Sequence, residues 1–355
     1  MLSWFDENAR DLPWRRSKDP YAIWVSEIML QQTRVAAVID HYGRFMQSFP
    51  TLDELAAAPE DQVLAHWSGL GYYRRARLLR KAAQFVAEQM GGKLPKTALA
   101  LRVLPGVGEY TAAAIASIGF GESVACVDGN VERVLCRVNG CPEGHATPSK
   151  SRTEAAQLLD PSRPGDFNQA MMELGALVCL PRSPRCVECP IRELCQTQGE
   201  HPVAERKKML SRQLTYAFLV RIAKERKART HSVQVLLEKR PAESSLMPGM
   251  WELPELSEER TPKEKKVLTL RHSITDTNYY VIIYEWAASE LQHLPIRENT
   301  REWFLVNDLL TLPLTGLARK TLQRLRAWPG YDAYGPVVRF DETLAEPPVR
   351  AGSAG

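Results

Sequence analysis

The chain has 355 residues and a formal net charge of +4, and this length allows two domains, each with its own core. No apolar run approaches a membrane span and the charged first residues do not read as a secretory signal, so we expect an intracellular, cytoplasmic protein. Nine Lys and Arg stand against two Asp and Glu in residues 201–230. This local excess indicates either a solvated connector or a basic strap along a phosphate backbone.

Residues 1–200 are predicted to be helical. Apolar residues recur at helical spacing, and Pro or Gly residues separate the segments, which is the pattern of a compact helical bundle. The predicted helices are Pro20–Gln31, Val35–Phe49, Arg75–Met90, Ala112–Phe120, Val131–Val138 and Asn168–Val178.

A second domain is predicted at 214–328, after a basic connector at 201–213. The apolar period there changes to two, which indicates strands and an α+β class. The predicted strands are Thr215–Ile222, Ser232–Lys239, Val267–Ser273, Tyr279–Trp286 and Glu302–Leu305, followed by a helix at Leu317–Arg326. Residues 329–355 are rich in Gly, Pro and Ala without periodicity, and we predict a disordered tail.

A tight turn joins two helical segments at Leu104–Thr111 and carries Gly106 and Gly108, two residues apart. Such a turn leaves backbone N–H groups free at the start of the next helix. The amides could bind an anion, in a hairpin of helices a DNA phosphate. The alternative is that the two glycines only punctuate the helices.

Four of the seven cysteines fall within seventeen residues at C-x6-C-x2-C-x5-C spacing. A four-cysteine zinc site usually has two short pairs separated by a long loop, whereas this run has one short pair with wide flanks. The spacing favours a [4Fe–4S] cluster, and zinc is the alternative. The predicted ligands are Cys179, Cys186, Cys189 and Cys195.

Several motifs in a fixed order resemble the helix-hairpin-helix DNA glycosylases of the endonuclease III superfamily, and within it the MutY-type adenine glycosylases. They are Leu12–Arg15, Ser26–Thr33, Gly69–Tyr73, Leu104–Gly108, Val127–Val131, Phe167–Ala176 and the cysteine run. The resemblance implies an all-α helix-hairpin-helix glycosylase domain with an iron–sulfur loop over 1–200. It also implies base excision repair of double-stranded DNA that carries adenine opposite 8-oxoguanine or guanine, by a DNA-associated monomer.

The same resemblance implies the chemistry of the site. Glu27 would be the general acid at adenine N7, Asp128 the carboxylate that stabilises the sugar cation, and Asn130 an orienting residue. The apolar helix around Glu27 would favour its protonated form through desolvation, although from its sequence alone a surface carboxylate is the simpler reading. Tyr110 stands where relatives that cut the strand carry lysine, and a phenol cannot form their imine. We therefore expect a monofunctional glycosylase.

Other matching positions imply contacts with DNA and with the extruded base. Gln32, Thr33 and Tyr72 match residues that bind and wedge the duplex, as base flipping requires. The residues that match the adenine pocket are Trp14, Arg15, Leu30 and Glu173.

Residues 214–328 resemble, more loosely, the Nudix-like domain that reads 8-oxoguanine in this family. Val267 and Leu268 stand where a Nudix hydrolase needs metal-binding carboxylates, so no hydrolase activity of that kind is expected. The loop that reads the lesion would use Thr275 and Asp276, although it departs from the family pattern. Two alternatives remain: an endonuclease III-like pyrimidine glycosylase with lyase activity, and a non-catalytic iron–sulfur DNA-binding module.

Overall fold

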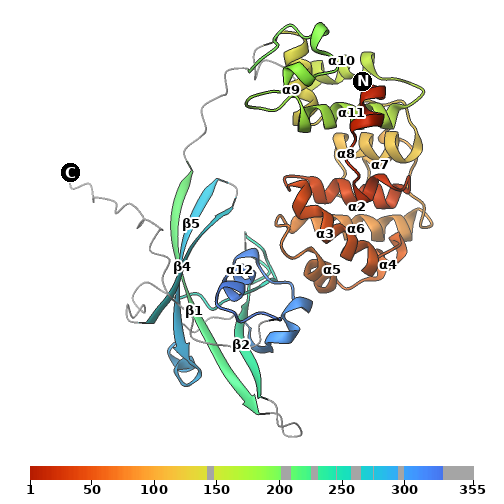
Figure 1. Ribbon diagram of the computed structural model, residues 1–355. Coiled ribbons are helices and arrows are strands. Elements are labelled where there is room, and N and C mark those ends of the chain that lie inside the picture. The colour runs from red at the N-terminus through yellow and green to blue at the C-terminus, as the bar shows by residue number, and fades with distance from the viewer. Residues whose placement is uncertain are drawn as a thin grey trace, which may run out of the picture. The chain divides into compact units, whose positions relative to one another are not determined.

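The computed structural model describes residues 1–141, 148–200, 209–224, 231–244, 246–256, 265–274, 276–294 and 300–330. The chain divides into two compact units, one of residues 1–63 and 72–206 and the other of residues 64–71 and 207–355 (Figure 1). Most of the predicted connector (201–208) and the predicted tail from residue 331 lie outside the described residues.

The first unit is built from helices joined by short loops. They are α1 Leu2–Asn8, α2 Pro20–Leu30, α3 Val35–Ser48, α4 Leu52–Ala57, α5 Glu60–Trp67 (which runs into the second unit), α6 Arg74–Gln89, α7 Ala98–Leu101, α8 Glu109–Ala114, α9 Gly129–Val138, α10 Pro148–Leu158 and α11 Pro164–Leu177. Every helix predicted in this region from apolar periodicity is present. Four of the helices that the periodicity missed, α1, α4, α5 and α7, have about two turns or fewer and carry too few apolar repeats to be recognised. The fifth, α10, has 11 residues, but its sequence is largely polar.

Helix α2 lies in the middle of this unit and packs against α3, α6 and α8 (Figure 1). Asp19 caps its start by accepting a hydrogen bond from the Tyr21 N–H at 3.0 Å, and Pro20 occupies the first turn. Its residues from Tyr21 to Met29 are all buried. A helix without a polar face is buried on all sides, so any charged residue within it loses contact with water.

The predicted helix Ala112–Phe120 begins earlier and changes character midway. Helix α8 starts at Glu109 because Gly108 is its N-cap, and a π-helical turn replaces the α-helix at Ile115–Gly119. The Ser117 hydroxyl donates to the Ala113 carbonyl at 2.7 Å. Serine bonds of this kind compete with the backbone ladder and bend helices.

Helix α11 approaches α9 closely because of a glycine. A Cβ added at Gly175 would lie 2.6 Å from the Cβ of Asn130. Any other residue there would push the two helices apart. The glycine therefore sets the distance between α11 and the start of α9.

Among its described residues, the second unit contains a six-stranded mixed sheet and the α-helix α12. The elements are β1 Leu210–Lys224, β2 His231–Lys239, β3 Trp251–Glu252, β4 Lys266–Ile274, β5 Thr277–Ala287, β6 Arg301–Leu305 and α12 Gly316–Arg324. The strand order is β3-β2-β1-β5-β4, with β6 paired to β2. Strands β1 and β5 are parallel, with Tyr216 opposite Ile283, and the other pairs are antiparallel.

Alternation along β1 fills a core on each face of the sheet. Tyr216 and Phe218 join the larger cluster, to which α12 contributes Leu317 and Leu322. Ala217 and Leu219 belong to the cluster on the opposite face of the sheet. Every predicted strand is present, but β1 begins at Leu210, inside the segment assigned to the connector. Its first residues are exposed, so their apolar pattern is weak.

No helix within the described ranges is long and apolar enough to cross a membrane.

Candidate active site and cysteine loop

Glu27 is a buried carboxyl group in the last turns of α2, with 7% of its surface exposed. The Tyr110 hydroxyl donates a hydrogen bond to its Oε2 atom at 2.9 Å. Burial raises the pKa of Glu27 to about 7, against the lowering effect of that hydrogen bond, and the nearby charge of Asp128 raises it further. The simpler reading of Glu27 as a surface carboxylate is therefore wrong, and the acid is half-protonated near neutral pH.

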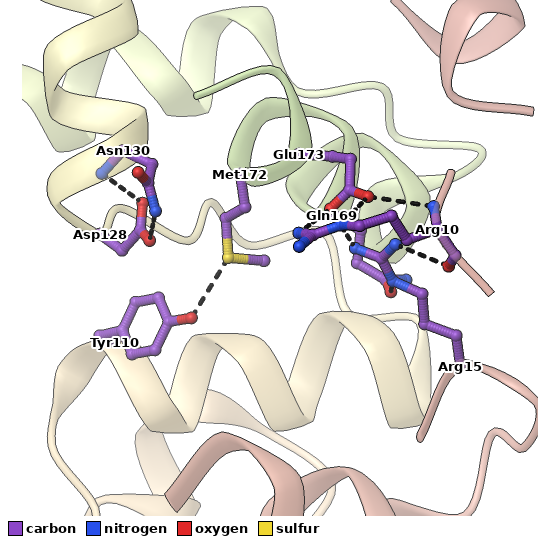
Figure 2. Close-up of polar contacts among 8 residues, drawn as sticks. All are labelled: Arg10, Arg15, Tyr110, Asp128, Asn130, Gln169, Met172 and Glu173. Carbon is purple, nitrogen blue, oxygen red and sulfur yellow. Dashed lines mark hydrogen bonds and ion pairs between the residues drawn. The ribbon is translucent and has the colours of Figure 1, made fainter. Parts of the chain in front are cut away.

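Tyr110 joins three helices. It stands in the first turn of α8, and its hydroxyl lies 3.2 Å from the Met172 Sδ atom of α11 (Figure 2). The same hydroxyl contacts Glu27 of α2. Burial and the neighbouring carboxyl groups hold the pKa of Tyr110 well above its usual value. The side chain is thus a neutral phenol that can donate one hydrogen bond and cannot form an imine.

Asp128 is the N-cap of α9 and is held rigidly by it. Its Oδ1 atom accepts from the backbone N–H groups of Asn130 at 2.9 Å and Val131 at 2.8 Å. The Asn130 side-chain amide donates to Oδ2 at 2.8 Å (Figure 2). The positive end of the helix favours a negative charge here. Two carboxyl groups with different surroundings therefore lie within electrostatic reach of each other, Glu27 and Asp128.

Arg133 connects Asn130, the partner of Asp128, to the cysteine loop. The sequence analysis did not predict this residue. Its Nη2 atom donates to the Asn130 Oδ1 atom at 2.9 Å and to the Gly175 carbonyl at 2.8 Å, while Nε donates to the Cys179 carbonyl at 2.8 Å. The available signal was its position three residues after Asn130, on the same face of α9.

The four cysteines lie on one loop that follows α11. Cys179, Cys186 and Cys195 are near enough that their charges, after burial, raise the pKa of Cys189. Within the described ranges, no three His, Cys, Asp or Glu side chains form a group that could hold a single metal ion.

A buried arginine anchors the start of this loop. Arg137 of α9, 2% exposed, donates to the Leu180 carbonyl at 2.6 Å and the Pro181 carbonyl at 2.9 Å. Its Nη1 atom also lies 3.4 Å from the Cys179 Sγ atom. A cation beside a thiolate suits a cluster whose four ligands each carry a negative charge.

A second polar cluster, apart from Glu27, surrounds Glu173 of α11. Glu173 is 1% exposed; its oxygens accept from Arg10 at 2.7 Å and from Arg15 at 2.9 Å (Figure 2). Burial would raise the pKa of Glu173, but the two arginines outweigh it and lower the pKa to about 2. Arg15 also donates to Gln169 at 3.1 Å.

The other residues predicted for the base pocket are more dispersed. Arg15 lies close enough to lower the pKa of Glu27, so the Glu173 cluster borders that acid. Trp14 is buried and meets the Tyr42 ring edge-on at 5.4 Å between centroids. Leu30 is half-buried at the end of α2.

The residues predicted to contact DNA lie in exposed turns of the same unit. Gly106 has a φ of 78°, and a Cβ there would lie 2.7 Å from the Leu78 side chain, so only glycine fits the hairpin. Gly108 precedes α8 and supplies no side-chain cap. Gln32 and Tyr72 are exposed and have positive φ values, and Thr33 is half-buried.

In the second unit, the predicted lesion loop corresponds to the β4–β5 hairpin. Asp276 is exposed at its turn, where it accepts from the Thr277 hydroxyl at 3.0 Å. Thr275 lies outside the described residues.

Two family models match the helical unit. The model described as HhH-GPD superfamily base excision DNA repair protein matches residues 25–161, and the iron–sulfur binding domain of endonuclease III matches residues 179–195. A solved thermostable thymine-DNA glycosylase aligns with a TM-score of 0.53 at 31% identity over 56% of this chain and 92% of that one. The helical unit is thus a helix-hairpin-helix glycosylase fold of the HhH-GPD class, with an iron–sulfur cluster bound by the segment 179–195.

Comparison with curated relatives identifies the family within this class. The adenine DNA glycosylase of Homo sapiens is 52% identical over 213 residues, 56% of this chain and 38% of the relative. That of Schizosaccharomyces pombe is 32% identical over 86% of this chain and 77% of the relative. The chain belongs to the adenine DNA glycosylase family. It spans about two fifths of the length of the human and rat relatives that it matches.

Proposed function

We propose that the protein is a monofunctional DNA glycosylase that hydrolyses the N-glycosidic bond of adenine mispaired with 8-oxoguanine or guanine. The observation that carries the proposal is the pair formed by Glu27 and Asp128, in which burial raises the pKa of one carboxyl group to about 7 and a helix N-terminus binds the other. Hydrolysis of a glycosidic bond requires one carboxyl group that protonates the leaving group and a second that stabilises the positive charge on the sugar.

In the proposed reaction, Glu27 donates its proton to the N7 atom of adenine, and the bond between the base and C1′ breaks. The electron pair of that bond leaves with adenine, so positive charge develops on the sugar. Asp128 stabilises this charge, with its orientation set by the Asn130 amide at 2.8 Å. Water then adds to C1′ and loses a proton, leaving free adenine and an abasic site.

Tyr110 and the cysteine loop have supporting roles in this scheme. The phenol hydrogen-bonds Glu27 at 2.9 Å and supplies no amine, so the strand stays uncut. Hydrolysis transfers no electrons. Cys179, Cys186, Cys189 and Cys195 would hold the cluster, which would order their loop. Arg133 joins that loop, at the Cys179 carbonyl, to Asn130.

Access to adenine requires that it leave the stack. We assign Gln32, Thr33 and Tyr72 to the duplex and the amides near Gly106 and Gly108 to a phosphate, because all lie in turns of the unit that contains Glu27. The extruded base would be received by Trp14, Arg15, Leu30 and Glu173.

The second unit is assigned to the base opposite adenine. Its mixed sheet and α12 are compatible with a Nudix-like domain over 214–328. The β4–β5 hairpin with Thr275 and Asp276 would read 8-oxoguanine. On this proposal the helical unit is at 1–200 and the tail at 329–355. Of the connector predicted at 201–213, the last residues belong to β1, which begins at Leu210.

The test is single-turnover adenine release from duplexes with adenine opposite 8-oxoguanine, guanine or thymine. We expect fast release opposite 8-oxoguanine, slower release opposite guanine, and little opposite thymine. Equal rates opposite the two purines would keep the glycosylase and remove the role of the second unit. No release from any duplex would refute the proposal and favour a binding module.

A further inference from the structure

Arg75, in the first turn of α6, reaches the turn that ends α2. Its Nη1 atom donates to the carbonyl oxygens of Ile28 at 2.9 Å and Met29 at 3.0 Å, and also to that of Gln31. Its Nη2 atom donates to the Thr33 hydroxyl at 3.1 Å. One half-buried guanidinium thus contacts four residues on both sides of Gln32.

These contacts explain how α2 can end without glycine. The last carbonyls of a helix have no partner in the helix, and the residue after the cap is commonly a glycine in the left-handed region. Here that residue is Gln32, exposed and with a φ of 55°. A residue with a side chain is strained in this conformation, so the turn needs support from elsewhere. The cation of Arg75 at the negative end of α2 supplies it.

The same guanidinium contacts a second residue of this kind. Tyr72 has a φ of 47° and is 46% exposed. The Arg75 Cζ atom lies 5.5 Å from the centre of its ring. A guanidinium over an aromatic ring is attracted to it. Separately, the backbone N–H of Arg75 donates to the Tyr72 carbonyl at 2.9 Å.

We propose that Arg75 is a positioning residue for base extrusion, which locks the turns of Gln32 and Tyr72 in the one arrangement that can enter the duplex. This inference rests on the proposed function, in which these two side chains wedge the DNA. Arginine suits the task because its planar fork donates in several directions at once, whereas a lysine ammonium is a point charge. Rigid side chains enter a base stack without losing conformational entropy at that moment.

A competing role is that Arg75 holds only the helix end that carries Glu27, since Ile28 follows that acid directly. The two roles predict different pH behaviour. If Arg75 only holds the end of α2, its loss would change the surroundings of Glu27 and shift the pH dependence of adenine release. If Arg75 positions Gln32 and Tyr72, its loss would lower the rate by the same factor at every pH and leave the pH dependence unchanged.

The experiment compares Arg75→Met and Arg75→Lys with Arg44→Met, which removes an exposed arginine of α3. Extrusion is measured by the fluorescence of 2-aminopurine placed beside the target adenine, in the Glu27→Gln background so that no base is released. Adenine release is measured under single turnover from pH 5 to 9 in proteins with Glu27 intact. Thermal melting reports on folding.

We expect Arg75→Met to lower both the extrusion signal and the rate of release by about 10- to 100-fold, as small misplacements of binding groups do. Arg75→Lys should be intermediate and Arg44→Met unchanged, with the pH dependence the same in all. If Arg75→Met does not fold, Arg75→Lys carries the comparison.

Unchanged extrusion in the Arg75 variants would overturn the inference, and so would a loss of release accompanied by a shifted pH dependence. The proposed function would fail differently, because the protein with both Arg75 and Glu27 intact would then release no adenine.

Discussion

The Tyr110 hydroxyl donates a 2.9 Å hydrogen bond to Glu27, a carboxyl group that burial holds protonated until about pH 7. The two effects oppose each other, because the hydrogen bond favours the ionised form and burial disfavours it. Burial is the larger. Glu27 therefore still carries its proton near neutral pH and can donate it there.

Adenine release should fall as the pH rises above about 7. Glu27 must be protonated to act as the acid, and burial raises its pKa to about 7, so the rate should decrease about tenfold per pH unit on the alkaline side. Single-turnover rates between pH 5 and 9 check this. A rate that stays constant from pH 6 to 9 would contradict it.

Tyr110→Phe should move this alkaline limb to higher pH. The hydrogen bond from Tyr110 lowers the pKa of Glu27, so its loss raises that pKa and keeps the acid protonated for longer. The variant should keep its fold, because phenylalanine fills the same space. Tyr280→Phe, in the second unit, is the control. A limb displaced to lower pH would show that the hydrogen bond has a different effect.

Glu173→Gln should destabilise the helical unit by about 2 to 4 kcal/mol at pH 7, because it leaves Arg10 and Arg15 without their buried counter-charge. In the folded protein the pKa of Glu173 is about 2, below the usual value of 4.5 for a glutamate carboxyl. Its contribution is therefore complete above about pH 4.5 and lost as the pH falls toward 2. Urea unfolding of the unaltered protein and of Glu173→Gln at several pH values measures this difference in the free energy of unfolding. An equal difference at pH 3 and pH 7 would contradict the prediction.

Arg133→Gln should slow adenine release by about 10- to 100-fold, the usual effect of removing a group that orients a site. The variant loses the bonds that join Asn130 to the Cys179 carbonyl. Iron content should stay close to that of the unaltered protein, because all four cysteines remain. Glu132→Gln, on the same helix, is the matched control. Full activity in Arg133→Gln would remove the proposed link.

Sequence reasoning found the strongly periodic helices and every longer strand, because their apolar spacing extends over several repeats. It missed β3, which has only two residues and therefore no repeat to recognise. The burial of Glu27 was not predicted from the residues alone, which favoured a surface carboxylate, because its helix also contacts neighbours that lie far away in the sequence. The resemblance to a known family supplied the remaining site residues.

Contacts between distant segments could not be predicted in this way. The bonds from Arg75 to the end of α2 join residues more than forty positions apart, and no periodicity encodes them. Arg133 was missed because its partners, Gly175 and Cys179, also lie far along the chain. The π-helical turn at Ile115–Gly119 depends on a single serine bond, which spacing does not show.

The central claim is that Glu27 donates the proton, and Glu27→Gln tests it most directly. Glutamine keeps the shape of the side chain and has no acidic proton. We predict that the variant binds a duplex with adenine opposite 8-oxoguanine as tightly as the unaltered protein and releases adenine at least about 100-fold more slowly. Release at a comparable rate would contradict the account, and loss of binding as well would make Glu27 a structural residue.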